Sequence, residues 1–519
     1  MARKYLLLIT VCLGTVLTAY VSSCVNIGLP NIMAALNLNL DSVVWVSLSY
    51  MLPYGALLPL TGKFGDEFGA KKLYIIGLIL FTIASLFCGM SASATFMIVS
   101  RVVQGIGASM ILPNAMAIVA ATFPVEQRGQ ALGIWGAMAA AGSAMGPTIG
   151  GYLIDHINWQ SIFFSITPLS IIGLLMAFFL IPSTKASVKT KIDYVGAFLL
   201  TVCLALLLLT LNQGQKEGWD SLYIRVLFYL SFSSFISFIL VEKYVESPIV
   251  DLTLFVNFGF SIANILNFIC YMAFYCAMFL LPFFLKNILN YSPVYAGIEL
   301  LPLTTAVIIF APVGGKMSDL LGNRIPTFLG MIIIALSLYM FSFINPHYGH
   351  KEFFIRLLIM GIGLGLMMSP LSSSAISILS RDKVGVGSGV FNLFKNIGSC
   401  IGVVFPETLL INREVFHQQN LSEYINPNMH AEDHIYKLLQ SLWGAQGMDA
   451  AQITKATMGV FTGEGFPRPE QYSAFKLILA QLTARNAAVL SFQDVFFIMS
   501  LIALGMGFLS LLLPSKTRV

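Results

Sequence analysis

Four charged side chains lie inside long apolar stretches of this 519-residue chain: Arg101, Glu299, Lys395 and Glu407. A charge in such a stretch is costly unless it is paired or faces water, so these residues are candidates for a proton or charge relay. Glu299 is the preferred proton carrier, because an isolated carboxyl group in lipid favours its protonated form. The alternative for Glu299, of at least equal weight, is a carboxylate in an external vestibule. For Arg101 the alternative is snorkelling to a helix end.

Amide and tyrosine side chains in the same apolar stretches form a second group of candidates. Six of them are expected to line a substrate cavity: Asn26, Tyr50, Asn114, Asn267, Tyr271 and Asn392. Intramembrane asparagines need hydrogen-bond partners and therefore favour a cavity or a helix contact. Most aromatic residues in spans are packing residues or interface anchors, which is the alternative for the tyrosines.

The patterns of several other chemistries are missing. No G-x-x-x-x-G-K-[ST] motif is present, so ATP is not the expected direct energy source. All seven cysteines fall inside apolar runs without a C-x-x-C pair, which argues against a disulfide framework or a thiolate metal site. The stretch from His430 to His434 is favoured as a solvated helix start over a metal site. No convincing His/Asp cluster suggests an intramembrane enzyme, so we expect no catalysis, no cofactor and no metal.

A short charged loop occurs twice, each time between two long apolar runs. The same offsets hold Gly62, Asp66, Gly69 and Lys71 in the first copy and Gly315, Asp319, Gly322 and Arg324 in the second. Such a duplication predicts two membrane-embedded halves of similar design. The two aspartates are expected to pair with nearby loop cations and helix N-termini, and so to hold the halves together in one conformation.

Small residues recur at every fourth position of another apolar segment, at Gly142, Gly146 and Gly150, with Pro147 and Gly151 among them. Small residues let two helix backbones approach closely. A proline inside a helix removes one backbone hydrogen bond and kinks the helix. This segment suits a rocking interface between the halves, and static packing is the alternative.

All of these residues must be positioned by membrane-spanning helices. The chain is 57% hydrophobic and 10% charged, with a mean hydropathy of +0.83, whereas soluble domains average about 25% charged residues. Apolar runs of roughly 20 residues recur along nearly the whole length, without the alternation of a β-barrel. The predicted fold is an all-α polytopic membrane protein with about 14 transmembrane helices.

The positive charges cluster in alternate loops, beginning with Arg3 and Lys4 and ending with Lys516 and Arg518. This is the positive-inside pattern, so those loops and both termini are expected in the cytoplasm. The net charge of +5 is therefore a topology signal. A nucleic-acid partner, which requires one contiguous basic face, is not expected.

The spans divide into two groups of six with a helix pair inserted between them. We expect a six-helix bundle over 1–182, a cytoplasmic linker with two extra helices over 183–258, a second bundle over 259–411 and 492–519, and an external insertion over 412–491. The insertion contains helical patterns over 435–443 and 472–482. It is equally consistent with a small structured cap or docking element and with a spacer.

Taken together, these motifs resemble those of the major facilitator superfamily. The segment 62–72 resembles its loop after the second helix, 101–107 its R-x-x-Q-G motif, and 142–151 the G-x-x-x-G-P-x-x-G-G motif of its antiporters. The extra helix pair is similar to the 14-helix drug:proton antiporter branch of EmrB/QacA type, and 412–414 and 426–427 resemble the long external loop of the EmrB subgroup. The resemblance covers essentially the whole chain. It implies two six-helix bundles that alternate access to a midplane cavity.

One departure from the family pattern bears on substrate and coupling. The acidic residue of the family's first-helix motif falls on Val21 here, and the arginine that many relatives carry in the thirteenth helix falls on Lys395. The resemblance assigns the missing acid to proton or cation handling. Its loss moves proton coupling elsewhere and tilts the expected substrates toward neutral or anionic amphiphiles.

The expected function is proton-coupled efflux of small amphiphilic compounds across the cytoplasmic (inner) membrane of a bacterium. The resemblance to EmrB-type proteins implies a periplasmic adaptor (a membrane fusion protein) and an outer-membrane channel as partners, which residues 412–490 would contact. The alternatives are a dedicated exporter of one endogenous metabolite or lipid, and a non-transporting membrane scaffold. The duplicated loop and the glycine-rich helix favour transport, because a rigid scaffold needs neither.

Overall fold

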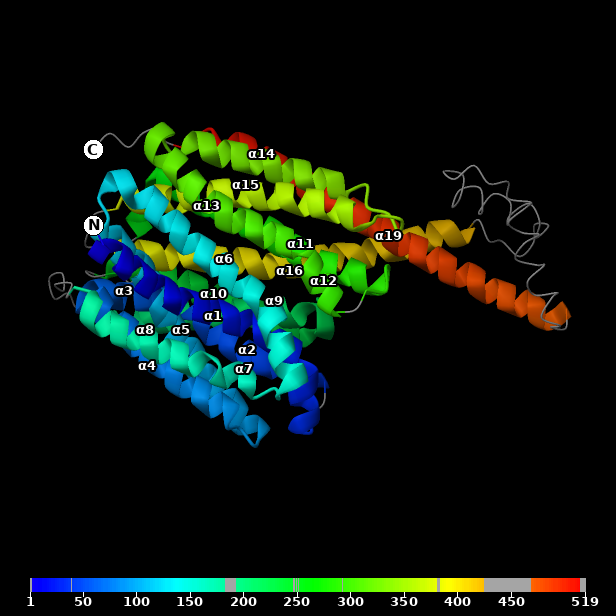
Figure 1. Cartoon of the computed structure of the whole chain (residues 1–519), viewed down its shortest axis with the longest axis horizontal. Coiled ribbons are helices and arrows are strands. Elements are labelled where there is room, and N and C mark those ends of the chain that lie inside the picture. Colours follow the sequence, from blue (N-terminus) through cyan, green and yellow to red (C-terminus); the bar gives the residue numbers. More distant parts are fainter. Residues whose placement is uncertain are drawn as a thin grey trace.

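The computed structural model describes residues 2–38, 40–182, 193–245, 248, 250, 252–291, 293–379, 383–423 and 468–513. Within this part of the chain the regular structure is helical, and no strand occurs. Long helices run side by side through the body of the molecule, and two of them project beyond it at one end (Figure 1). The all-α fold predicted from the sequence is confirmed.

The N-terminal bundle spans residues 2–38 and 40–182. It contains α1 (Ala2–Ala35), α2 (Leu40–Ala56), α3 (Leu58–Phe68), α4 (Ala70–Gly89), α5 (Ala94–Thr122), α6 (Val125–His156), α7 (Ser161–Phe164) and α8 (Ile166–Leu180). Local sequence explains several boundaries. Pro59 lies in the first turn of α3, where its missing N–H group leaves no bond unmade. Ser93 begins α5 by accepting a hydrogen bond from the Phe96 N–H group.

Two helices, α9 (Tyr194–Glu217) and α10 (Leu222–Tyr244), form a pair in which α9 also touches α2 and α16. The side chains of Asp193 and Ser221 begin these helices by accepting hydrogen bonds from the N–H groups of Gly196 and Ile224. A short 3₁₀ helix, η1 (Leu252–Val256), leads into the next bundle.

The C-terminal bundle begins where the Asn257 side chain caps α11. It contains α11 (Phe258–Asn287), α12 (Pro293–Glu299), α13 (Leu301–Leu321), α14 (Arg324–Phe341), α15 (His350–Ser377), α16 (Val384–Glu423) and α19 (Arg468–Ser510). The division into bundles follows the helix contacts: α1, α4, α5, α6 and α8 pack among themselves, as do α11, α13, α14, α15, α16 and α19.

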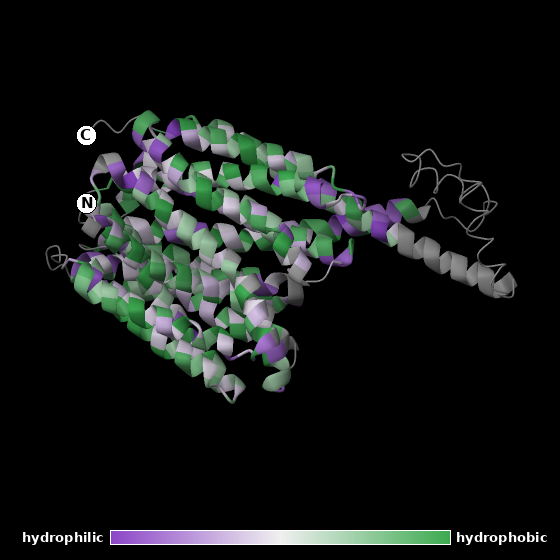
Figure 2. Cartoon of the chain, in the orientation of Figure 1, coloured by the Kyte–Doolittle hydropathy of each residue, from purple (hydrophilic) through white to green (hydrophobic). Residues whose placement is uncertain are grey.

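In the described residues, 12 helical segments are long and apolar enough to cross a membrane. The α2–α3 pair and α6 run through the body beside them (Figure 1). Apolar residues follow the lengths of the helices, and hydrophilic residues gather toward the helix ends (Figure 2). Large apolar side chains such as Phe179 on α8 and Leu230 on α10 are exposed, as expected where lipid is the solvent.

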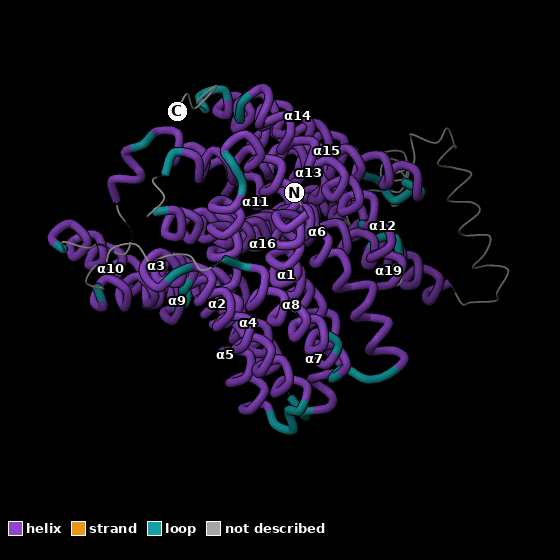
Figure 3. The backbone as a smooth tube through the Cα atoms, turned by 60° about the vertical axis from the view of Figure 1, so that its left-hand side comes forward, coloured by secondary structure: helices purple, strands orange, loops and turns teal. Residues whose placement is uncertain are grey.

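The two ends of the body are distinguished by the chain termini. α1 begins and α19 ends at the same end (Figure 1), which we call the terminal end, and the α3–α4 and α13–α14 connections lie there as well. The other end is called the opposite end. The two bundles meet through α6 against α13 and α15, and through α16 against α3 and α5. Figure 3 shows the bundles from a second direction.

The insertion predicted over 412–491 is in part an extension of two membrane helices. α16 continues without a break to Glu423, and α19 already begins at Arg468. Both project from the body at the opposite end (Figure 1). The helix predicted over 472–482 lies inside α19. The helix predicted over 435–443 lies outside the described residues, as does the linker segment 183–192.

Candidate functional site

The two copies of the charged loop have the same backbone geometry at the terminal end. α3 ends at Gly69 with a φ of 96°, and α13 ends at Gly322 with a φ of 83°. Each of these N–H groups donates to a carbonyl four residues earlier, Gly65 O at 3.0 Å and Ser318 O at 2.9 Å. A positive φ strains any residue that carries a Cβ atom, so glycine is the residue that can end both helices this way.

The aspartate of the first copy reaches across to the other bundle. Asp66 on α3 accepts hydrogen bonds from the N–H groups of Gly385 and Val386, at 2.7 and 2.8 Å, in the first turn of α16. These N–H groups have no partner within their own helix. The negative carboxylate also lies at the positive end of the α16 dipole, where it is stabilised.

The aspartate of the second copy makes the reciprocal contact. Asp319 on α13 accepts hydrogen bonds from the N–H groups of Gly129 and Gln130, at 3.0 and 3.1 Å, near the start of α6. Each bundle therefore extends a carboxylate to the N-terminal part of a helix in the other. We call the Asp66–α16 and Asp319–α6 contacts the two locks.

Glycines allow the helices to come close enough for these bonds. A Cβ atom on Gly385 would overlap the carbonyl oxygen of Gly62, and a Cβ atom on Gly62 would overlap that of Gly385. Gly129 and Gly315 form the equivalent contact in the second lock. At both locks the helices therefore meet backbone against backbone, which side chains would prevent.

The final cation of each motif copy acts within its own bundle. The Lys71 ammonium group donates to the Phe178 carbonyl oxygen at 2.9 Å, in the last turn of α8. The Arg324 Nε donates to the Leu513 carbonyl oxygen at 2.8 Å, just after α19. Both cations therefore lie at the negative end of the last helix of their bundle, the favourable end for a positive charge.

Two serine hydroxyl groups add hydrogen bonds between the bundles. Ser388 on α16 donates to the Pro113 carbonyl oxygen on α5 at 2.9 Å, and Ser369 on α15 donates to the Gly129 carbonyl oxygen on α6. Sequence reasoning missed these serines, and it missed Gly129 and Gly385. The signal that could have found the glycines is a G-x-x-x-G pair near the start of α6 and another near the start of α16.

The glycine stripe of α6 faces its own bundle. Cβ atoms on Gly142, Gly146 and Gly150 would meet Val16, Ser23 and Cys24 of α1, respectively. Gly151 has open space beside it, and the side chain of Pro147 lies outside the described residues, although α6 is one helix from Val125 to His156. The geometry of these glycines favours packing between α1 and α6, whereas α6 meets the other bundle through Gly129.

Arg101 is buried inside the N-terminal bundle, not at a helix end. Its Nε donates to the Val46 carbonyl oxygen at 2.9 Å, its Nη1 donates to Gln104 Oε1 at 2.6 Å, and its guanidinium lies 4.4 Å from the ring centre of Tyr50. Gln104 in turn donates to the Ser85 hydroxyl at 2.7 Å. No described carboxylate pairs with this guanidinium. Its positive charge therefore lies in the interior of the bundle, where its hydrogen bonds to Val46 on α2 and Gln104 on α5 fix its position.

Lys395 on α16 is the second interior cation. Its ammonium group lies 4.6 Å from the ring centre of Tyr271 on α11. The Tyr271 hydroxyl is within electrostatic range of Tyr54 on α2 and Tyr275 on α11, and Tyr54 stacks on Tyr50 with 5.7 Å between ring centres. The tyrosines thus form a cluster shared by both bundles, and it includes two residues predicted to line the cavity.

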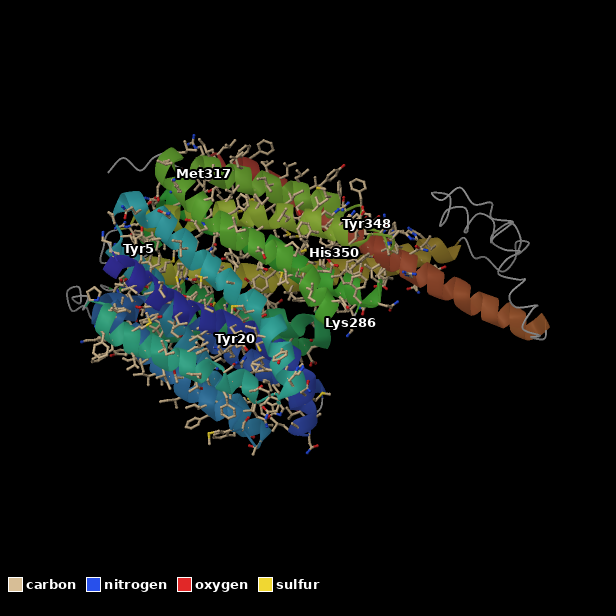
Figure 4. The ribbon with its side chains drawn as sticks, in the orientation of Figure 1. Tyr5, Tyr20, Lys286, Met317, Tyr348 and His350 are labelled. Atoms are coloured by element: carbon tan, nitrogen blue, oxygen red, sulfur yellow. The ribbon has the colours of Figure 1, made fainter. Side chains whose placement is uncertain are left out.

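Glu299 lies at the last residue of α12, at the opposite end. One carboxylate oxygen is 2.7 Å from Nδ1 of His350, and the other is buried without a hydrogen-bond partner. His350 is 63% exposed and lies beside Tyr348 at the margin of the body (Figure 4). The structure thus places Glu299 against a solvent-exposed histidine, and its role as a proton carrier or as a vestibule carboxylate stays a prediction. Glu407 is half-buried on α16 and forms no described contact with Glu299 or His350.

The predicted cavity asparagines have different surroundings. Asn114 donates to the Thr61 carbonyl oxygen at 3.2 Å within the N-terminal bundle, and Asn267 donates to that of Phe391 at 2.8 Å within the C-terminal bundle. Both therefore join neighbouring helices of one bundle. Asn392 contacts the Met116 sulfur across the bundles at 3.8 Å. The side chain of Asn26 lies outside the described residues.

No group of three His, Cys, Asp or Glu side chains that could hold a metal ion occurs in the described part of the chain. His430 and His434, the pair considered as a metal site from the sequence, lie outside it.

Comparison with known proteins adds family relationships to this geometry. A model of the Major Facilitator Superfamily matches residues 11–403. The riboflavin transporter RibZ of Clostridioides difficile is 30% identical over 444 residues, which cover 85% of this chain and 94% of that protein. The multidrug export protein EmrB of Haemophilus influenzae is 25% identical over 464 residues, 89% of this chain and 90% of that one. The solved structure of the human organic anion transporter MFSD10 shares the fold, with a TM-score of 0.57 at 14% identity, over 78% of this chain and 93% of that chain.

Proposed function

This chain belongs to the major facilitator superfamily, and on that premise we propose that it exports small amphiphilic compounds from a bacterial cytoplasm by alternating access, in exchange for protons. The family makes the chain a multi-pass membrane transporter of small molecules and not an enzyme. The direction of transport, the proton coupling and the substrate class are the proposal, and neutral or anionic compounds are the preferred substrates.

The reciprocal locks carry the alternating-access part of the proposal. Asp66 and Asp319 each bond to backbone N–H groups of the other bundle, and glycine contacts surround both bonds. Such contacts stabilise one closed arrangement of the terminal end and can break together when the bundles rock apart. We assign the terminal end to the cytoplasm, because the basic loops and both termini gather there.

The relatives support export of diverse compounds while leaving a narrower function open. EmrB of Haemophilus influenzae is named a multidrug export protein, and this chain aligns with nearly its whole length. RibZ, which is named a riboflavin transporter, matches over a similar length at 30% identity. A dedicated transporter of one metabolite is therefore the second candidate function. A non-transporting scaffold has no such support.

Proton coupling must use groups other than an acid at residue 21, which is a fully buried valine in α1. We propose that protons enter at the Glu299–His350 pair, because the carboxylate lies 2.7 Å from the imidazole and His350 is open to solvent at the opposite end. Arg101 and Lys395 would then hold the positive charge of the interior, and Glu407, half-buried on α16, is a second candidate acid on the proton path.

The projecting ends of α16 and α19 suit a partner on the outer side of the inner membrane. They extend beyond the body at the end away from the termini (Figure 1), which is the periplasmic side under the assigned orientation. We propose that an adaptor, a membrane fusion protein leading to an outer-membrane channel, contacts them.

The test uses inverted membrane vesicles with an imposed proton gradient and a panel of cationic, neutral and anionic amphiphiles. Uptake should require the gradient and should stop when a protonophore is added. Glu299→Gln should lower gradient-driven uptake, whereas Glu352→Gln should not, because Glu352 is a half-buried carboxylate that accepts the Gly349 N–H bond at the start of α15.

Each other outcome points elsewhere. Uptake of a single compound from a metabolite panel would favour the dedicated transporter. Uptake that persists with the protonophore would refute proton coupling. Absence of uptake for every compound would refute the export function.

A further inference from the structure

The interior of the body holds two cations whose surroundings differ. Arg101 donates to an amide oxygen and a carbonyl oxygen and lies on a tyrosine face. The Lys395 ammonium group has three donor hydrogens, yet within the described residues it contacts the Tyr271 ring and no hydrogen-bond acceptor or carboxylate. The Lys395 side chain is partly exposed, so its ammonium group keeps donors available for an anion that reaches it.

The next residue on α16 presents another donor without an acceptor. Asn396 is 8% exposed, and its Nδ2 has no hydrogen-bond partner. It lies directly against Gly55 of α2, where a Cβ atom would overlap it. The Lys395 side chain thus contacts α11, and the Asn396 side chain contacts α2. A helix turns about 100° per residue, so the two donors lie on either side of the line along which α16 faces the other bundle.

Contacts one and two turns before Lys395 show which side of α16 faces the other bundle. Ser388 bonds to Pro113 and Asn392 contacts Met116, both on α5. Lys395 and Asn396 follow along the same face of α16, between the two bundles. Both side chains therefore lie near the contact between the bundles, which is where we place the bound compound.

Aromatic rings border the same region. The Tyr50 and Tyr54 rings on α2 stack nearly parallel, with 8° between their planes. Tyr54 and Tyr271 are within electrostatic range of each other across the bundles. Flat π surfaces favour offset stacking or edge contact with another aromatic ring. The described residues of this region therefore offer donors and ring faces, and they place no carboxylate against Lys395.

We propose that Lys395 and Asn396 form an anion subsite and that the neighbouring tyrosines receive an aromatic ring, so that the preferred cargo is an aromatic carboxylate or phenolate. The anionic oxygen of such a compound supplies the acceptor that both donors lack, and charge-assisted bonds of this kind are stronger than neutral ones. The inference rests on the proposed export function and narrows its substrate class.

The test measures binding to the purified full-length protein in detergent, separately from transport. The ligands are a fluorescent aromatic carboxylate, 1-pyrenebutyrate, and its neutral amide. Wild type should bind the carboxylate more tightly than the amide. Lys395→Met should weaken carboxylate binding by about 10- to 100-fold, the size of one lost charged hydrogen bond, and should weaken amide binding much less, because a bond to a neutral acceptor is weaker.

Two further variants separate charge from packing. Lys395→Arg keeps the positive charge and should restore most of the preference for the carboxylate, which a merely structural role for Lys395 would not require. Asn396→Leu removes the second donor and should lower carboxylate affinity less than Lys395→Met does. Equal affinity of wild type for carboxylate and amide, or unchanged carboxylate binding in Lys395→Met, would overturn the proposal.

Binding and transport can fail independently. Selective carboxylate binding without gradient-driven uptake in vesicles would refute the export function and leave the anion subsite standing. Uptake of cationic and neutral compounds alone, unaffected by Lys395→Met, would keep export and refute the subsite.

Discussion

Replacing Asp319 by asparagine should open the terminal end. The carboxylate accepts two hydrogen bonds from backbone N–H groups of Gly129 and Gln130, at 3.0 and 3.1 Å. An amide keeps one acceptor oxygen, loses the charge, and presents an NH₂ group to the other N–H. With about 1.5–3 kcal/mol for each hydrogen bond to a charged group, we expect Asp319→Asn to destabilise the closed arrangement by about 2–3 kcal/mol. That is a shift of about 30- to 150-fold in the ratio of closed to open molecules.

The population is measured by electron paramagnetic resonance between two spin labels, one at Gln127→Cys on α6 and one at Leu320→Cys on α13. Both positions are exposed, and all seven native cysteines are buried, so the labels should go to the added pair. Asp319→Asn should add a longer distance to the wild-type distribution. Asp220→Asn, the same change at an exposed carboxylate near the start of α10, is the matched control. If the Asp319→Asn distribution matches wild type and control, the lock does not hold the bundles together.

The remaining predictions concern the contacts around the locks and the interior cation. Gly385→Ala should add the same kind of long distance to a label pair across α3 and α16, because its Cβ meets backbone of the other bundle, whereas Gly151→Ala enters open space and should not. Arg324→Gln should lower the thermal unfolding temperature in detergent, corresponding to about 1.5–3 kcal/mol for the lost charged bond to the carbonyl after α19. Lys316→Gln, an exposed change on α13, should have little effect on that temperature. Arg101→Lys should reduce transport per molecule without reducing the amount in the membrane, because an ammonium group cannot keep both bonds in the geometry of the guanidinium.

Sequence reasoning could predict the all-α membrane fold and the importance of the duplicated loop. Apolar length is a strong signal, since a bilayer crossing needs about 20 apolar residues. Asp66 and Asp319 were found because their motif repeats. Helix N-termini were expected as partners, but not which helices, because the partners are backbone N–H groups, which every residue except proline carries. The glycines that let the helices approach each other are visible in the sequence only as pairs spaced four residues apart, which is a weak signal.

The contacts that sequence reasoning left open or missed share a physical cause. A stripe of small residues indicates that another helix packs closely but not which helix it is. The stripe from Gly142 to Gly150 faces α1, a helix of its own bundle. Likewise, Glu299 and His350 are 51 residues apart and meet because α12 and α15 meet. Pairings of this kind depend on how the bundles are assembled, which the order of residues alone does not display.

If the protein alternates access, binding of cargo at the interior site must change the free energy of opening the locks. A bound compound can shift the balance between two arrangements only by as much as its affinities for them differ. If each of the two locks contributes about the 2–3 kcal/mol expected for Asp319, together they make the closed arrangement of the terminal end considerably more stable than the open one. Lys395 belongs to one bundle, and Tyr50 and Tyr54 belong to the other, so a compound that touches all three loses contacts whenever the bundles separate around it. A site shared in this way gives cargo a different affinity for each arrangement, which a site inside one bundle, such as the surroundings of Asn114 or Asn267, would not provide.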